Sequence, residues 1–235
     1  MINKRAESPA AAVADIAEGA TVMIGGFGEA GSPIELIHAL IDQGARHLTV
    51  ISNTGSGRVG LAALIANGQV RKMICSYPRS AHSTVFPELY RRGEIELELV
   101  PQGTLAERIR AGGAGIPAFY TPSSVGTLLA AGKESRRFQG EEYVMEYGLR
   151  ADFALVKAAR ADRYGNLVYN KTARNFAPIM CMAAETAIAQ VKELVEAGGM
   201  DPETVVTPGV FVRRLVVVAN PAQESQLVKE GQCYP

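Results

Sequence analysis

The sequence predicts an α/β fold, an open, largely parallel sheet flanked by helices with an antiparallel elaboration in its second half. Over the first 110 residues, short apolar runs alternate with Gly-rich or polar loops and amphipathic segments. This alternation is typical of βαβ units, whose strands are parallel and whose crossovers are right-handed. Beyond Gly112 the pattern changes to strand-like segments. Two of them, 153–158 and 167–169, flank the turn 163–166 as in an antiparallel hairpin.

Each element has its own signal along the chain. A buried strand is a short apolar run such as Thr21–Ile24, a helix carries apolar residues on one face, and a half-exposed strand alternates apolar with acidic residues, as Ile95–Leu99 does. We interpret residues 1–220 as a single domain and 221–235 as a polar C-terminal tail that we expect to fray. In order, the sequence predicts strand 21–24, helix 33–41, strand 47–51, helix 61–66, strand 72–76, a helix that ends near residue 92, strand 95–99, a helix that begins near residue 104, strands 142–147, 153–158 and 167–169, helix 186–196 and strand 211–219.

Charge and composition exclude several classes of protein. With 24 Lys+Arg against 24 Asp+Glu the formal net charge is zero, whereas a nucleic-acid-binding protein normally carries a basic excess. No apolar run approaches the ~18 residues of a membrane span, and the N-terminal residues lack the apolar segment of a signal peptide. The 3 cysteines are too scattered for a disulfide framework, and neither they nor the 3 histidines have metal-ligand spacing. We therefore expect a cytoplasmic protein that binds no nucleic acid, membrane or metal, and that holds any anionic ligand by locally placed groups.

A glycine-rich loop follows the first predicted strand. The carboxyl ends of parallel strands are where α/β sheets bind ligands, so this loop, 25–31, and the loops 53–60 and 102–103 are the candidate binding edge. The strings Ser32–Glu35 and Thr104–Glu107 have the pattern of capping boxes, which predicts two helix N-termini that open on that edge. Capping boxes also occur on many helices that bind nothing. What favours function at the first loop is its four glycines in seven residues, because backbone without Cβ atoms lets a ligand lie against it; they are Gly25, Gly26, Gly28 and Gly31.

A dinucleotide site is the obvious alternative for this loop. Gly26-x-Gly28-x-x-Gly31 matches the GxGxxG fingerprint between a strand and a helix. An NAD site also needs an acidic residue at the end of the second strand, but that strand ends with Val50–Asn53. We therefore do not expect NAD. A second cationic segment, 171–176, could hold phosphate, although a solvated turn is the commoner structure for such a string.

Five long strings resemble one family of enzymes. They run from Gly19 to Pro33, Val100 to Tyr120, Ala151 to Ala158, Ala173 to Phe176 and Thr207 to Phe211. These strings are similar to those of family I coenzyme A transferases of the 3-oxoacid type. The resemblance covers nearly the whole chain and implies the CoA-transferase fold, which sugar-phosphate isomerases share.

Within that family the chain resembles the A (alpha) chain of two-chain enzymes, which implies that its partner is a B chain in an A2B2 heterotetramer. The implied reaction moves CoA from succinyl-CoA to a 3-oxoacid, most closely 3-oxoadipate, with acetoacetate as the alternative acceptor. CoA thioesters are then substrates and no cofactor is permanently bound. The family's nucleophile is a glutamate in a Ser-Glu-Asn-Gly string of the B chain, and no such string occurs here, which implies no catalytic residue in this chain. The implied CoA-binding residues are Gly25, Gly26, Phe27, Gly28, Glu29, Ala30 and Gly31, and the implied active-site wall is Asn53 and Gln102.

Two strings depart from the family pattern. The usual Ser-Asn-Asn-Ala-Gly is shortened here and has Thr54 in place of the second Asn, and Ser123–Val125 replaces Thr-Gly-Tyr. These departures leave the acyl substrate open. Two hypotheses from other classes also remain. One is a non-catalytic regulator that binds CoA or a phosphorylated metabolite. The other is a relative of sugar-phosphate isomerases, which would need an acid/base pair of carboxylates that Glu29 alone does not provide.

Overall fold

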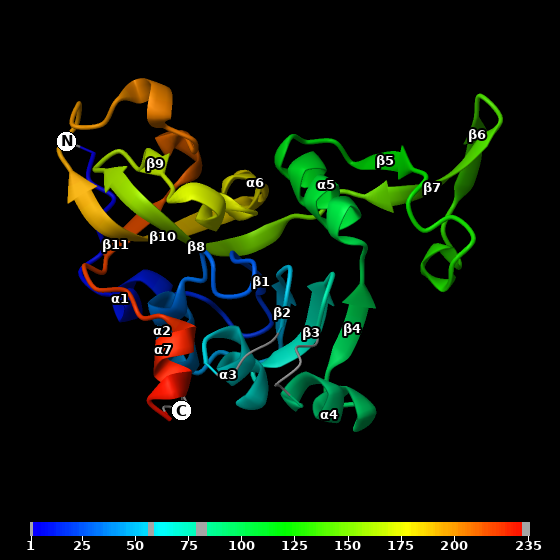
Figure 1. The fold of residues 1–235 in the computed structure, drawn as a ribbon, viewed down its shortest axis with the longest axis horizontal. Coiled ribbons are helices and arrows are strands. Elements are labelled where there is room, and N and C mark those ends of the chain that lie inside the picture. The colour runs from blue at the N-terminus through cyan, green and yellow to red at the C-terminus, as the bar shows by residue number, and fades with distance from the viewer. Residues whose placement is uncertain (1, 56–58, 79–83, 232–235) are drawn as a thin grey trace.

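The computed structural model describes residues 2–55, 59–78 and 84–231. Over these residues the chain forms an eight-stranded sheet in the order β11-β10-β8-β1-β2-β3-β4, and β9 pairs with β8 (Figure 1). Every pairing in it is parallel except that between β8 and β9, which confirms the predicted fold class and the predicted hairpin. The strands are β1 Thr21–Ile24, β2 Leu48–Ile51, β3 Val70–Cys75, β4 Glu96–Leu99, β8 Ala151–Asp162, β9 Leu167–Val168, β10 Ala184–Val195 and β11 Arg214–Val217.

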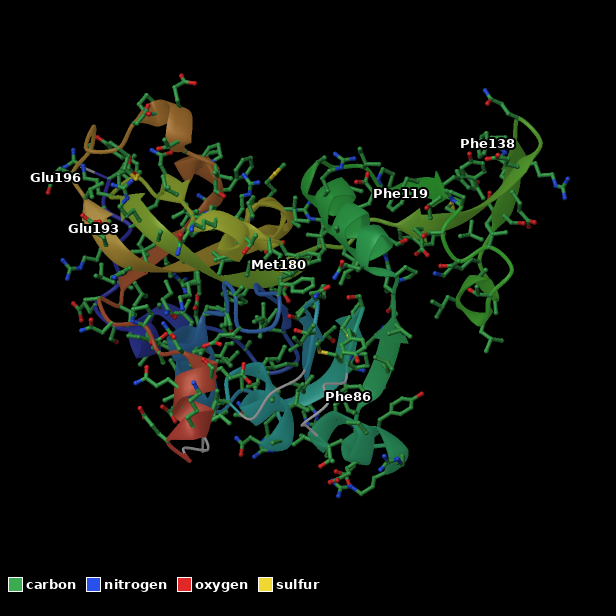
Figure 2. All side chains as sticks on the ribbon, in the orientation of Figure 1. Phe86, Phe119, Phe138, Met180, Glu193 and Glu196 are labelled. Carbon is green, nitrogen blue, oxygen red and sulfur yellow. The ribbon has the colours of Figure 1, made fainter. Side chains whose placement is uncertain are left out.

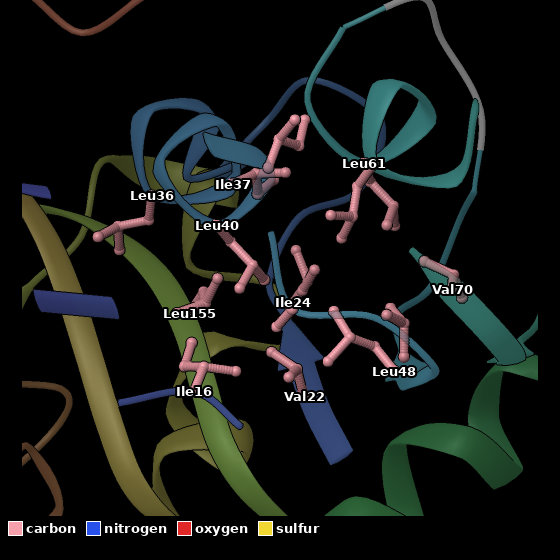
Figure 3. Packing of buried hydrophobic residues seen from close by; sticks show 14 of the residues in the cluster. Ile16, Val22, Ile24, Leu36, Ile37, Leu40, Leu48, Leu61, Val70 and Leu155 are labelled. Atoms are coloured by element: carbon pink, nitrogen blue, oxygen red, sulfur yellow. The ribbon is translucent and has the colours of Figure 1, made fainter. Parts of the chain in front are cut away.

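Helices cover both faces of this sheet (Figure 1). Side chains alternate along β1, so Val22 and Ile24 pack with α1 to α4, whereas Met23 packs with α5 and α6. Figure 3 shows the first of these two clusters, in which Leu40 of α2 lies among sheet residues such as Leu155. Burying one such side chain stabilises the fold by about 1.5–3 kcal/mol. The α-helices are α1 Pro9–Val13, α2 Ile34–Gln43, α3 Leu61–Ala66, α4 Val85–Arg91, α5 Gln102–Gly113, α6 Ala177–Ala183 and α7 Glu224–Lys229, and the 3-10 helices are η1 Leu128–Ala130, η2 Lys171–Arg174, η3 Pro202–Thr204 and η4 Gly209–Phe211.

A second, antiparallel sheet of three strands projects from the main one (Figure 1). It has the order β5-β7-β6, with β5 Ala118–Thr121, β6 Ser135–Phe138 and β7 Glu141–Tyr147. Figure 2 shows Phe119 and Phe138 on this projection, far from Phe86 on α4. The sheet is antiparallel, as the sequence predicted for part of the second half, but only its middle strand β7 lies in a predicted strand range. Arg108 joins it to α5, since its Nε donates to Tyr147 O at 2.8 Å and lies 3.7 Å from a carboxylate oxygen of the buried Glu146.

The predicted helix 186–196 is wrong, because these residues belong to strand β10. β10 lies between β8 and β11, and helices cover it, so Ala187–Val191 is buried without a break. A strand buried on both faces has no period-two pattern and cannot be told from a buried helix by periodicity. The helix of this region, α6, lies just before the strand.

The prediction that the C-terminal tail frays is wrong for its described residues, 221–231. Residues 224–229 form α7, and Ala222 N donates to Glu35 Oε1 at 2.5 Å. This contact holds the segment against α2. In the described part of the chain, every helix is too short or too polar to span a membrane.

Candidate functional site

The glycine-rich loop 25–31 leaves the carboxyl end of β1, as the sequence predicted. Gly25 N donates to Leu155 O at 2.9 Å, which extends the pairing of β1 with β8 by one step before the chain turns away. Phe27 N then donates to Ala30 O at 3.0 Å and closes a tight turn. Gly28, within that turn, has a φ of +57°, and a Cβ there would meet no atom within 4 Å. The tip of the loop therefore presents bare backbone.

Gly31 has a different reason to be glycine. Its φ is +80°, and a Cβ at this position would overlap the carbonyl oxygen of Ala173. The loop is thus packed against the segment that leads into α6. Gly31 is therefore needed for packing within the fold, whereas the open space beside Gly28 lies at the surface of the loop.

Asn175 fixes the loop, and its role was missed in the sequence. Its Oδ1 accepts from Gly26 N at 3.2 Å, and its Nδ2 donates to Ala30 O at 2.8 Å, so one amide joins both ends of the loop. Its φ of +23° places it in the left-handed region, which asparagine tolerates better than most residues. The only signal was its place in the string Ala173–Phe176, where the cationic residues drew attention instead.

Asn53 and Gln102, the two predicted wall residues, lie in direct contact. Gln102 Nε2 donates to Asn53 Oδ1 at 2.9 Å, and Ser76 Oγ donates to the same oxygen at 2.6 Å. Asn53 is 1% exposed and also accepts at its carbonyl oxygen from Tyr77 N at 3.1 Å. Residues that follow β2, β3 and β4 are therefore bound together at one edge of the sheet.

The loops after β1 and β2 share a hollow of about 20 Å³, which gives room for about one water molecule. Gly28 lines it from the first loop, Thr54 from the second, and Glu224 of α7 from the C-terminal segment. The departure from the family pattern at Thr54 thus lies at this edge. Ser123–Val125 instead follows β5 in the projecting sheet. Of the predicted loop 53–60, residues 56–58 lie outside the described residues.

Both predicted capping boxes are wrong. No side chain caps α2, and the Glu35 carboxylate accepts instead from Gln190 Nε2 and Ala222 N. The second helix, α5, begins at Gln102, so Thr104 lies inside its first turn, and the buried Thr104 hydroxyl has no hydrogen-bond partner among the residues that the structure describes. In both cases the residue before the helix is a proline, Pro33 or Pro101, whose side chain cannot accept a capping hydrogen bond. The N-terminus of α5 nevertheless opens next to Asn53.

The C-terminal segment also contacts the glycine-rich loop. Glu29 Oε1 accepts from Ser225 Oγ at 3.1 Å and from Ser225 N at 3.2 Å. The carboxylate of the loop is therefore engaged in holding α7. No local pattern in the sequence indicates this contact, since the two residues are 196 positions apart.

Titratable groups near this edge are not poised for nucleophilic catalysis. Burial raises the pKa of the Cys75 thiol to about 12 and that of Cys181 to about 12, so neither forms a thiolate at neutral pH. Burial lowers the pKa of His38, whose Nε2 accepts from Gly60 N at 3.1 Å and so holds the start of α3. Within the described ranges, no group of three or more His, Cys, Asp or Glu is arranged to hold a metal ion. What the edge offers is backbone N–H groups and the amides of Asn53 and Gln102.

A family model described as "Coenzyme A transferase" matches residues 6–218. The chain belongs to the coenzyme A transferase family. It is 60% identical over 226 residues to the A chain of a 3-oxoadipate CoA-transferase from Pseudomonas putida, and the match covers 96% of this transferase chain and 98% of the relative. It is also 52% identical over 229 residues to the A chain of a succinyl-CoA:3-ketoacid coenzyme A transferase from Xanthomonas campestris, with 96% of this chain and 94% of that one covered.

Solved structures of transferases share the fold. An acyl-CoA transferase apoenzyme from Escherichia coli O157:H7 superposes with a TM-score of 0.84 at 24% identity over 94% of this chain. This chain spans 48% of that enzyme, about half its length. The glutaconate coenzyme A-transferase from Acidaminococcus fermentans gives a TM-score of 0.79 at 21% identity, with 92% of this chain and 77% of that chain covered.

Proposed function

We propose that this transferase chain is the A component of an enzyme that moves CoA from succinyl-CoA to a 3-oxoacid, with 3-oxoadipate as the acceptor. The observation that carries the proposal is the 60% identity to the A chain of a 3-oxoadipate CoA-transferase across 96% of this chain and 98% of that relative. The edge of the sheet supports it, because its amides and bare backbone can bind a thioester, whereas the one carboxylate of the loop, Glu29, is already bound to Ser225. The nucleophile is assigned to the partner B chain.

The proposed reaction passes the acyl groups and CoA through one glutamate of the B chain. The glutamate carboxylate attacks the thioester carbonyl of succinyl-CoA, which gives a mixed anhydride and CoA thiolate. The thiolate attacks the glutamyl carbonyl of the anhydride, which releases succinate and leaves a glutamyl-CoA thioester. The carboxylate of the 3-oxoacid then attacks this thioester and repeats the two steps in reverse, which gives 3-oxoacyl-CoA and restores the glutamate. No oxidant or metal takes part in any step.

This chain's part in the reaction is binding and charge stabilisation. We assign the pantetheine arm of CoA to the bare backbone of loop 25–31, whose residues Gly25, Gly26, Phe27, Gly28, Glu29, Ala30 and Gly31 lie at the end of β1. Gln102 has two N–H donors on one nitrogen, and one of them is used by Asn53. We assign the other to the thioester oxygen as it gains negative charge, because a preorganised donor is most effective there. Asn53 then positions Gln102.

Reconstitution tests the proposal. The purified chain, a B chain carrying the Ser-Glu-Asn-Gly string, and their mixture are each assayed with succinyl-CoA and 3-oxoadipate. We expect transfer by the mixture alone. Transfer by the isolated chain would overturn the assignment of the nucleophile to the partner, and CoA binding without transfer by the mixture would favour the non-catalytic regulator.

The acceptor is tested in the same mixture. The 52% identity to a chain of a succinyl-CoA:3-ketoacid coenzyme A transferase makes acetoacetate the second candidate. We expect kcat/KM for 3-oxoadipate to exceed that for acetoacetate, and the reverse order would replace 3-oxoadipate as the substrate.

We further propose an A2B2 assembly in the cytoplasm that carries no permanently bound cofactor. The names of both relatives identify each of them as one of the component chains of its enzyme, which supports a second chain. Light scattering of the purified complex gives its mass, and fractionation of the source cells gives its location. A mass that fits one copy of each chain would contradict the tetramer.

A further inference from the structure

A groove of about 790 Å³ lies on the other side of the glycine-rich loop from Asn53. In the sheet, β8 flanks β1 on one side and β2 flanks it on the other. Asn53 follows β2, whereas the groove is lined by β8 together with Glu29–Gly31, the β9 region and the C-terminal segment at Pro221. Its volume is within the range of ligand pockets. The loop therefore separates two distinct spaces along the same edge of the sheet.

The groove exists because β8 lacks a partner strand at this point. β1 pairs with β8 up to Ile24 opposite Leu155, and β9 begins to pair with Arg160 opposite Val168. β10 pairs with one edge of β8 along its whole length, so β1 and β9 both pair with the opposite edge. Residues 156–159 of β8 lie between the two pairings, and no strand of the described part of the chain pairs with them on this edge. The opening is thus built into the sheet.

The groove is strongly cationic. Among the described residues that line it, Lys157, Arg160 and Lys192 are basic and Glu29 alone is acidic. Glu29 already accepts from Ser225. Within the described part of the chain, neither Lys157 nor Lys192 forms an ion pair.

The two lysines lie on one face of the sheet. Lys157 lies opposite Gln190 in the register of β8 and β10, and Lys192 is two residues further along, so it shares that face. Arg160 points to the other face, where its register partner is Glu193, which lies at the left end of the main sheet (Figure 2). Glu35 is the acid connected to Gln190, and its carboxylate is also bound to Ala222 N. Of the basic residues of the groove, the two lysines are therefore those whose positive charge is least neutralised by nearby acidic side chains.

A second hollow adds to this charge. It has a volume of about 580 Å³ and shares Tyr169 with the groove. Lys171 and Arg174 line it, and none of its described lining residues is acidic. The whole chain carries no net charge, so this concentration of basic residues beside the loop is local. It includes the cationic segment 171–176, to which the proposed reaction gives no role.

We propose that this groove binds the phosphorylated nucleotide end of the CoA thioester, with Lys157 and Lys192 in contact with its phosphates. The proposal rests on the proposed function, because it concerns the same substrate. A CoA thioester carries a diphosphate and a 3′-phosphate at one end and its reacting carbonyl at the other. With the carbonyl at Asn53 and Gln102, the pantetheine arm crosses loop 25–31 and the nucleotide reaches the cationic side. Lysine ammonium groups suit phosphates as point charges.

Truncated substrates test the groove separately from the chemistry. The complex with the B chain is assayed with succinyl-CoA and with the succinyl thioester of pantetheine, which lacks the nucleotide. We expect the double variant Lys157→Gln/Lys192→Gln to raise KM for succinyl-CoA about a hundredfold, at about tenfold for each charge-assisted contact. Its kinetics with the pantetheine thioester should equal those of the unmodified complex. The control Arg91→Gln/Arg137→Gln removes two exposed charges elsewhere and should leave KM for both thioesters unchanged.

Two results would overturn the groove proposal while the proposed function stands. One is an unchanged KM for succinyl-CoA in the double variant, and the other is an equal loss with both thioesters. If the double variant fails to assemble, two other variants decide. We expect the exposed single variant Lys192→Gln to raise KM for succinyl-CoA about tenfold. The conservative variant Lys157→Arg/Lys192→Arg keeps both charges and should leave this KM unchanged.

A binding measurement needs no turnover. Calorimetry with adenosine 3′,5′-bisphosphate should give a signal with the unmodified complex that the double variant loses. If the unmodified complex transfers no CoA but binds this probe, the proposed function fails and the groove proposal survives. Absence of probe binding to the unmodified complex would overturn the groove proposal.

Discussion

Gly28 and Gly31 belong to one loop but are glycine for different physical reasons. Both have positive φ values, +57° and +80°, yet a Cβ would enter open space at the first and overlap the Ala173 carbonyl at the second. A side chain at Gly28 would therefore strain only the backbone, whereas one at Gly31 would also push the loop away from Asn175, which holds it. Ligand contact and internal packing can thus be separated by two alanine substitutions.

We expect Gly31→Ala to lower the free energy of unfolding by about 2 kcal/mol or more and Gly28→Ala by about 1 kcal/mol, since a left-handed alanine costs roughly 1–2 kcal/mol. Gly28→Ala should also weaken CoA binding, because its Cβ lies where the ligand would meet the backbone. Urea unfolding of the chain and calorimetry of the complex measure the two effects. Gly19→Ala, at the other end of β1 with φ +77° and an open Cβ position, is the matched control and should leave CoA affinity unchanged. Equal CoA affinity in Gly28→Ala would remove the tip of the loop from the binding site.

Gln102 and Thr104 share the first turn of α5 but differ in their polar contacts. Gln102 binds Asn53, whereas the Thr104 hydroxyl is buried without a partner among the described residues. We expect Gln102→Ala to lower kcat about a hundredfold with little change in KM for succinyl-CoA, because an oxyanion donor acts in the transition state. Thr104→Val keeps the shape of the side chain and removes the unpaired hydroxyl, so activity should persist and the free energy of unfolding should rise by about 1 kcal/mol. Steady-state kinetics and urea unfolding test both, and a change in KM alone for Gln102→Ala would assign it to substrate binding.

Among elements, ion pairs add to the backbone pairing and apolar packing that join β3, β4 and α5. Glu98 of β4 pairs with Lys72 of β3 at 2.7 Å and with Arg108 of α5 at 2.8 Å. Burial opposes ionisation of Glu98, but the two cations outweigh burial, and the pKa of Glu98 lies below its ordinary value of 4.5. The helix that carries Gln102 is therefore attached to the sheet by a group that titrates in acid.

The sign of the pH effect follows from this shift. Below its ordinary pKa of 4.5, Glu98 binds a proton in the unfolded chain before it does so in the folded chain. Its stabilising contribution is thus complete above that pH and is lost as the pH falls through the folded-state pKa. We expect the urea midpoint to fall on acidification from about pH 6 to about pH 3, and to fall less in Glu98→Gln. Glu142→Gln, at an exposed position of β7 in the projecting sheet, is the control and should leave the acid dependence as it was. An equal fall of the urea midpoint on acidification in Glu98→Gln would contradict the assignment of this pH dependence to Glu98.

Elements with a periodic or short, sharply bounded apolar run were predicted correctly, and those without one were not. The four strands from β1 to β4 and the helices between them lie within a few residues of their predicted ranges, because each has a periodic or sharply bounded apolar run. β10 was mistaken for a helix because it is 12 residues long and its buried central residues show no alternation, and the edge strands β5 and β6 were missed because they are short and none of their residues is buried.

The candidate site divides in the same way. The positions of the glycine-rich loop, Asn53 and Gln102 follow from the rule that parallel strands present their carboxyl ends at one edge, and the structure brings Asn53 and Gln102 into contact. Asn175 and Ser225 could not be predicted, because each meets the loop from more than a hundred residues away and no local pattern encodes such a contact. Whether these residues bind CoA stays a prediction.

On the scale of the whole molecule, the absence of net charge makes affinity for an anion a local property. The sequence pI is about 6.8, so the molecule exerts no general attraction on a CoA thioester at neutral pH. Attraction by the groove and the neighbouring hollow is then screened within a distance of about 10 Å at 0.1 M salt.

We therefore expect KM for succinyl-CoA to rise between about 0.05 M and about 0.3 M KCl, because the lysines of the groove are open to solvent. The rise should be much smaller in Lys157→Gln/Lys192→Gln and absent for the pantetheine thioester. Initial rates of the reconstituted complex at several salt concentrations measure this. A salt dependence that is equal for both thioesters would place the screened charges elsewhere in the assembly.

The bond from Gly26 N to Asn175 Oδ1 joins residues 149 positions apart, and β1 is paired on one side with β8, which the ribosome makes much later. During translation the first βαβ units emerge with one edge of β1 uncovered and the glycine-rich loop without its anchor. Contacts of such long range slow folding and leave strand edges open to aggregation meanwhile. A nascent chain released before residue 175 therefore has the loop's sequence but not its shape, and co-expression with the partner cannot restore what the missing asparagine supplies.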